Sequence, residues 1–171
     1  HISAAAGSLA WMAMEWIRHG KPSVLGIVTG MVAGLGTITP ASGFVGPAGA
    51  LIIGLTAGVV CYSATAFLKH TLKIDDSLDV FPVHGMGGIL GTLLAGVFVG
   101  ILGGAGLAEG MTMGGQVWVQ FVGVAATLMY CGILSWIILK LIDAVIGLRV
   151  TLDEETQGLD IVLHDETGYN L

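Results

Sequence analysis

Residues 22–68 read PSVLGIVTGMVAGLGTITPASGFVGPAGALIIGLTAGVVCYSATAFL and contain no Asp, Glu, Lys, Arg or His. Two further runs are similar: residues 110–139 have no formal charge, and residues 80–108 have only the proton that His84 can bind. Each run is longer than the ~20 apolar residues that cross a bilayer as a helix. The sequence therefore predicts an all-α, polytopic membrane protein and excludes the ordinary classes of cytosolic enzyme.

The composition also indicates a membrane protein. Of the 171 residues, 54% are hydrophobic and 11% are charged, whereas soluble globular chains have about 25% charged residues. The net charge of -6 is unevenly spread, since six of the twelve acidic residues follow Arg149. No basic cluster supports nucleic-acid binding. We interpret Cys61 and Cys131, which lie inside apolar runs, as small buried side chains rather than a disulfide or metal pair.

Apolar runs separated by Gly, Pro and charged residues predict five membrane-spanning helices, over residues 2–17, 23–39, 44–68, 81–102 and 112–148. The last is longer than a bilayer is thick, so we expect it to tilt or to project from the membrane. All six Lys and Arg residues fall on one side of this arrangement: Arg18, Lys21, Lys69, Lys73, Lys140 and Arg149. The positive-inside rule makes that side the cytoplasm, so the tail is expected there too.

Glycines recur four residues apart on the predicted helices, in the sets Gly26, Gly30, Gly34; Gly54, Gly58; Gly87, Gly91; and Gly96, Gly100. Small residues at this spacing let helix backbones approach closely in lipid, so we interpret most of them as packing seams. A second interpretation, the wall of a narrow pathway, applies to a minority. The interruption at Thr39 and Pro40 is compatible with a substrate site, although a simple turn between helices has the same pattern.

His84 is the most informative single residue, because a histidine inside a span is costly and is a functional hypothesis by default. Its neutral imidazole has one donor and one acceptor, so it can pass a small hydrogen-bonding solute or a proton. The alternative is an interfacial histidine that bonds a backbone carbonyl. Asp79 and Pro82 before it predict an N-cap acid and a first-turn proline. We expect the acidic loop at residues 75–79 to be a solvated cap rather than a metal site.

Two strings in the chain are highly specific. Residues 79–85 have the pattern Asp-x-Phe-x-Val-His-Gly, and residues 158–169 have the pattern Gly-Leu-Asp-x-x-x-His-x-Glu-x-x-Tyr. Further matching stretches are residues 20–26, 38–43, 75–78, 108–110 and 147–149. Together they closely resemble the second half of the ammonium transporter (Amt/Mep/Rh) family, specifically its bacterial Amt branch, over the whole length of the chain.

This resemblance implies an eleven-helix subunit, built from two inverted five-helix repeats and a long final helix and assembled as a homotrimer with one pore per subunit. The chain resembles that protein from its seventh helix onward, so we expect a partial transmembrane domain over residues 1–149, with the N-terminal half missing. His84 matches the second of two pore histidines, and Thr39 and Phe81 are expected to flank the substrate pathway. The first pore histidine belongs to the missing half and is not His1.

The tail, residues 150–171, resembles the family's cytoplasmic regulatory segment. In the family this segment packs across neighbouring subunits on the cytoplasmic face, where the PII signal protein docks in bacteria. The residues that match it are Gly158, Asp160, His164, Glu166 and Tyr169.

The expected function is transport of ammonium or ammonia across the cytoplasmic (inner) membrane through a hydrophobic pore with a histidine relay. The resemblance implies no enzymatic activity and no cofactor. The expected partners are ammonium or ammonia, membrane lipid, further copies of the chain in a homotrimer and a PII-type protein, but no nucleic acid. Two alternatives stay open: an ammonium sensor of the same fold that signals through its tail, and a haem or redox membrane protein with a second intramembrane histidine facing His84.

Overall fold

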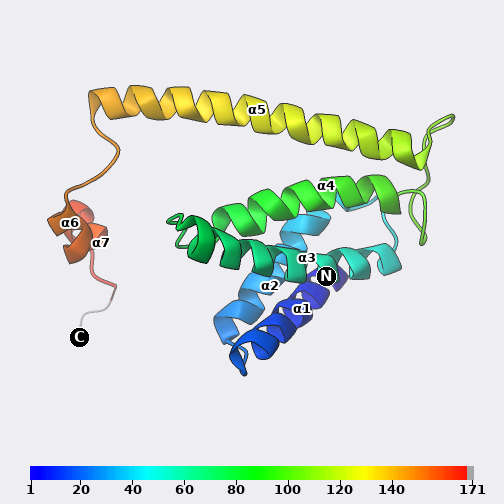
Figure 1. Ribbon diagram of the computed structural model, residues 1–171, viewed down its shortest axis with the longest axis horizontal. Coiled ribbons are helices and arrows are strands. Elements are labelled where there is room, and N and C mark those ends of the chain that lie inside the picture. Colours follow the sequence, from blue (N-terminus) through cyan, green and yellow to red (C-terminus); the bar gives the residue numbers. More distant parts are fainter. Residues whose placement is uncertain (169–171) are drawn as a thin grey trace. The chain divides into compact units, whose positions relative to one another are not determined.

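The computed structural model describes residues 1–168, and every regular element in that range is helical (Figure 1). The chain divides into two compact units, residues 1–125 and a second that begins at residue 126, which are described separately. Within the described residues, four segments are long and apolar enough to cross a membrane: Val24–Ala41, Pro47–Leu72, Phe81–Phe98 and Met113–Val145. The predicted all-α membrane class is confirmed.

The first unit is a bundle of packed helices. Its elements are α1 (Ile2–His19), α2 (Val24–Ile38), the 3-10 turn η1 (Thr39–Ala41), α3 (Pro47–Ala66), the π-helical turns η2 (Phe67–Leu72) and η3 (Phe81–Gly85), α4 (Met86–Phe98) and the start of α5 (Met113–Val145). α1 packs against both α2 and α3, and α4 packs against the same two helices (Figure 1).

Local sequence sets the helix ends. The Ser23 side chain accepts the N–H of Gly26 at 2.9 Å and so caps the start of α2. Pro47 lies in the first turn of α3. Backbone N–H groups have no partner within the helix at this position, so a proline costs no hydrogen bond there. α1 ends at Gly20, whose φ of 76° favours glycine.

Each of the five predicted helices is present, but two expectations need adjustment. The helix predicted over residues 81–102 ends at Phe98, because the chain then turns and Leu102 takes a left-handed φ of 52°. The first predicted span is the helix α1, which is not among the four sufficiently apolar segments. Glu15 and Arg18 lower its apolar character, so its crossing of the membrane stays a prediction.

Small residues allow α1 to pack closely on α2 and α3. A Cβ atom added to Gly30 would lie 2.5 Å from the Cβ of Trp11, and one added to Gly58 would lie 2.5 Å from the Cβ of Ala10. Both added atoms would also lie 2.7 Å from the carbonyl oxygen of Gly7. These separations are shorter than van der Waals contact, so the packing seams predicted at Gly30 and Gly58 are confirmed.

Two buried clusters form the core of the first unit. One consists of Trp11, Ala33, Cys61, Tyr62 and Val83. The other consists of Ala41, Ile53, Ala95 and Phe98. The predicted burial of Cys61 is confirmed, but it was wrong for Cys131, which is exposed because no residue of α5 is buried within this chain.

The second unit contains the rest of α5 and two short helices, α6 (Leu152–Gln157) and α7 (Leu159–His164). Thr151 and Glu154 form a capping box: the Glu154 carboxylate accepts the N–H of Thr151 at 2.8 Å, and the Thr151 hydroxyl accepts the N–H of Glu154 at 3.4 Å. The hydrogen bonds from the backbone and then the hydroxyl of Thr151 lower the pKa of Glu154. Arg149 pairs with Glu155 at 3.2 Å.

Candidate functional site

His84 lies in η3, the π-helical turn that leads into α4, near one end of a candidate membrane span. The side chains of Pro82 and Val83 are buried, and Val83 belongs to the core cluster of Trp11. His84 and Phe81 are exposed in this chain. The buried neighbours hold the turn against the bundle, and the histidine lies on its surface.

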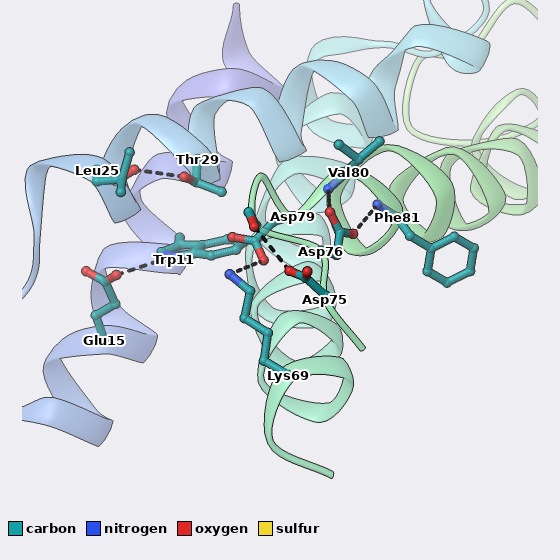
Figure 2. A network of polar contacts seen from close by, with 11 residues as sticks. Trp11, Glu15, Leu25, Thr29, Lys69, Asp75, Asp76, Asp79, Val80 and Phe81 are labelled. Carbon is teal, nitrogen blue, oxygen red and sulfur yellow. Dashed lines mark hydrogen bonds and ion pairs between the residues drawn. The ribbon is translucent and has the colours of Figure 1, made fainter. Parts of the chain in front are cut away.

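Asp76 caps the start of η3. One of its carboxylate oxygens accepts the N–H of Val80 at 2.9 Å and the other accepts that of Phe81 at 2.8 Å, as Figure 2 shows. These two hydrogen bonds, first the one from Phe81, hold the pKa of the Asp76 carboxyl below its usual value. A negative charge also suits the positive end of the helix. The predicted acidic cap is therefore present, at Asp76.

The expectation that Asp79 is the N-cap acid was wrong. Its Oδ1 lies 2.7 Å from Nζ of Lys69, in an ion pair that joins the loop to η2 (Figure 2). A carboxylate turned toward Lys69 does not reach the N–H groups of the turn. Asp75 accepts the hydroxyl of Ser77 at 3.2 Å, and within residues 1–168 no group of three or more His, Cys, Asp or Glu side chains is placed to hold a metal.

The two residues expected beside His84 are both at the surface. Thr39 is exposed in η1, and its hydroxyl donates to the carbonyl oxygen of Leu35 at 2.7 Å. Phe81 is 47% exposed. The helix α2 approaches the histidine through Gly36, where an added Cβ would lie 3.9 Å from Nδ1 of His84. Among the described residues, no hydrogen bond or ion pair joins Thr39, Phe81 and His84 into one cluster.

A polar cluster where α1, α2 and α3 meet was missed by the sequence reasoning. It surrounds a cavity of about 200 Å³ whose lining includes Glu15, His19, Ser23, Tyr62 and Lys69. The Glu15 carboxylate accepts the N–H of Ser23 at 2.7 Å, and the hydroxyl of Tyr62 lies 3.1 Å from Nε2 of His19. The signal was Glu15, the one acidic residue of α1. These bonds hold the ends of neighbouring helices together.

The residues expected in the regulatory tail are partly brought together. Gly158 has a φ of 100°, which favours glycine, and Asp160 lies in the first turn of α7. The N–H of Glu166 donates to the backbone carbonyl of Asp160 at 3.0 Å, so the chain folds back on itself after His164. Tyr169 lies outside the described residues.

The sequence model of the Ammonium Transporter Family matches residues 1–169. The chain belongs to the ammonium transporter family. It is 46% identical to the ammonium transporter of Aquifex aeolicus, over 99% of this chain and 40% of the relative. It is 45% identical to the ammonium transporter Amt1 of Archaeoglobus fulgidus, over 99% of this chain and 43% of the relative.

A solved structure described as a sensor Amt protein is also similar, with a TM-score of 0.86, 31% sequence identity and coverage of 95% of this chain and 40% of that one. The chain thus spans 40–43% of the length of these ammonium transporter relatives. The family and the apolar helices make it a multi-pass membrane protein. The Aquifex aeolicus and Archaeoglobus fulgidus relatives carry the names of transporters, a class of protein distinct from enzymes.

Proposed function

We propose that this chain forms the C-terminal part of a transporter that moves ammonium or ammonia across the cytoplasmic membrane. The observation that supports this most directly is the exposed His84 within a candidate span of a chain from the ammonium transporter family. Two relatives that match the chain over 99% of its residues are named ammonium transporters. In this proposal the exposed face of His84 borders the pathway.

The chemistry of the substrate explains why a histidine is useful there. Moving an ammonium ion into an apolar passage costs several kcal/mol of desolvation, even after relaxation. Neutral ammonia is small and crosses the same passage at a lower cost. An imidazole can hydrogen-bond ammonia and can take and return a proton near neutral pH. His84 would therefore be the inner member of a histidine relay that divides the barrier into smaller steps.

Thr39 and Phe81 would flank this pathway. Phe81 lies on the same turn as His84, and half of its surface is uncovered in this chain. Thr39 continues α2, the helix whose Gly36 approaches the imidazole. Its hydroxyl donates to the carbonyl oxygen of Leu35. The hydroxyl oxygen of Thr39 can still accept a hydrogen bond from an N–H group of the substrate.

Exposed apolar surface supports a lipid environment and an assembly of several copies. No residue of α5 is buried within the chain. α2 exposes a row of large side chains, Val24, Leu25, Val28, Met31 and Leu35. Such surface is covered by lipid or by other protein in a membrane. We therefore keep membrane lipid and a homotrimer as proposed partners, the trimer resting on the family resemblance.

The tail is proposed as a cytoplasmic regulatory segment that a PII-type signal protein contacts. Its residues 150–168 are not an unstructured acidic extension, since α6, α7 and a capping box order much of them. Gly158, Asp160, His164 and Glu166 lie in this folded part. The assignment of their role rests on the family resemblance.

A second candidate function is an ammonium sensor of the same fold that signals through its tail. One specific observation keeps it in view, the structural similarity to a sensor Amt protein. A transporter and a sensor differ in whether ammonium produces a flux. Uptake of ammonium or ammonia into proteoliposomes therefore separates the two, because a sensor that transports little gives almost no signal.

The test of the proposed function is His84→Gln in the full-length transporter. Glutamine keeps a donor and an acceptor but cannot be protonated near neutral pH, so the proton path is cut. We expect ammonium-evoked charge movement in proteoliposomes to fall at least about tenfold, equivalent to about 1.4 kcal/mol. A loss of discrimination against potassium would be the alternative form of the same defect.

The matched control is His70→Gln, the same substitution at an exposed histidine in η2. It should leave both the charge movement and the cation selectivity unchanged. Wild-type currents and selectivity in a folded His84→Gln protein would refute the role assigned to His84 and would favour the interfacial histidine.

A further inference from the structure

The direction of His84 depends on the π-helical form of η3. The buried face of α4 runs through Gly87, Gly91 and Ala95. Continued backward at the helical spacing of three or four residues, this face would include both position 83 and position 84. The structure buries Val83 but exposes His84. The i→i+5 bond from the N–H of Met86 to the carbonyl oxygen of Phe81 marks the wide turn that separates them.

Such a turn needs its backbone groups satisfied at the start, where a helix has free N–H groups. Asp76 accepts the N–H of Val80 and that of Phe81, one with each oxygen. Pro82 has no N–H, and the N–H of Val83 donates to the backbone carbonyl oxygen of Asp79 at 3.0 Å. One carboxylate thus accounts for both N–H groups that the loop backbone leaves free.

The neighbouring acids do not share this role. Asp75 is exposed and accepts only a hydroxyl, that of Ser77, at 3.2 Å. Asp79 points to Lys69 and joins the loop to η2. Charge-assisted hydrogen bonds that backbone N–H groups donate to a carboxylate are roughly twice as strong as neutral ones. Asp76 therefore fixes the backbone of η3 more firmly than either neighbour can (Figure 2).

We infer that Asp76 is a positioning residue for His84: it holds the π-helical turn that directs the imidazole away from the core and toward the transport pathway. The inference rests on the proposed function, because it assigns Asp76 a part in transport only through His84. Asp76 is eight positions away from His84 in sequence and acts through the backbone of Val80 and Phe81.

The experiment compares Asp76→Ala with Asp75→Ala in the full-length transporter. Both remove one carboxylate from the same loop, but only the first frees the N–H groups of η3. We expect Asp76→Ala to lower ammonium-evoked charge movement per folded protein about tenfold and to weaken discrimination against potassium. Asp75→Ala should stay within about twofold of wild type, a difference below about 0.4 kcal/mol.

Rescue by a conservative variant separates positioning from a general folding role. Asp76→Asn keeps one carbonyl oxygen as an acceptor and loses the charge and the second acceptor. We expect its charge movement per folded protein to return to within about threefold of wild type. A merely structural role would lower the amount of folded protein in all Asp76 variants and leave the selectivity of the folded fraction unchanged.

The outcomes are distinguishable. Wild-type flux and selectivity in Asp76→Ala, together with a defective His84→Gln, would overturn this inference and leave the proposed function standing. A wild-type His84→Gln protein would overturn the role assigned to His84, on which this inference rests. Equal defects in Asp76→Ala and Asp75→Ala would mean that the loss of one negative charge from the loop causes the effect, and would refute the positioning role of Asp76. If Asp76→Ala fails to fold, Asp76→Leu, which also has no acceptor but keeps more of the side-chain volume, takes its place against Asp75→Leu, and equal values for these two refute the inference.

Discussion

Gly36 offers a test at the scale of one residue, because a methyl group fits there but touches the proposed pathway. An added Cβ would lie 3.8 Å from the carbonyl oxygen of Val83 and 3.9 Å from Nδ1 of His84, which is ordinary contact. Replacing glycine by alanine inside a helix stabilises it by roughly 0.5–1 kcal/mol. We therefore expect Gly36→Ala to keep or raise the melting temperature and yet to lower ammonium flux in proteoliposomes about threefold or more.

The control for this variant is Gly123→Ala on α5, where an added Cβ has no neighbour within 4 Å. It should keep or raise the melting temperature, as Gly36→Ala does, but leave the flux unchanged. Unchanged flux in Gly36→Ala would contradict a pathway that passes along the face of His84, because a methyl group beside the imidazole should narrow such a pathway.

At the same scale, sequence identified His84 but not the residue that supports it. An ionisable group in an apolar run stands out by composition alone. Composition does not show which of Asp75, Asp76 and Asp79 caps the turn. All three precede Pro82 within a few positions, and any of them could do so. The path of the loop decides, and it turns Asp79 toward Lys69 and Asp76 toward the free N–H groups.

At the scale of the element, the helices were predictable because apolar runs and Pro-Gly turns have clear lengths. The π-helical turns were not. Whether a turn closes i→i+4 or i→i+5 depends on which side chains the rest of the fold buries, here Pro82 and Val83. The end of α4 at Phe98 was missed for a related reason, since the apolar residues that follow belong to a turn.

The packing of α1 on α3 gives the prediction for this scale. Gly58→Ala would place a methyl group 2.5 Å from the Cβ of Ala10 and 3.0 Å from the backbone nitrogen of Trp11. The two helices must move apart, and overpacking of this kind costs about 1–3 kcal/mol. We expect a melting temperature several degrees lower in detergent. Gly36→Ala is the matched control, because the same change there has room, and equal melting temperatures for both variants would argue against a tight seam.

At the scale of the whole molecule, the candidate spans predict which side of the membrane each loop occupies, and this prediction does not depend on α1. Three candidate spans, Pro47–Leu72, Phe81–Phe98 and Met113–Val145, lie between Ser42 and Thr156. An odd number of crossings places these two residues on opposite sides. Lys69 lies at the end of the first of these spans and Lys73 directly follows it, so the positive-inside rule predicts that their side is the cytoplasm. Two further crossings bring Thr156 to that same side.

Cysteine labelling tests this arrangement. In a background with Cys61 and Cys131 replaced, single cysteines at Ser42 and Thr156, both exposed, should react with an impermeant reagent from opposite sides. Only the cysteine at Ser42 should be labelled in intact cells. Ser77→Cys, in the exposed loop between the first two of the three spans, should behave like Thr156→Cys. Labelling of Ser42 and Thr156 from one side would mean that one of the three helices does not cross. The shortest of the three, Phe81–Phe98, would be the first candidate for a helix that does not cross. Because His84 lies in this helix, that result would count against the pathway proposed for His84.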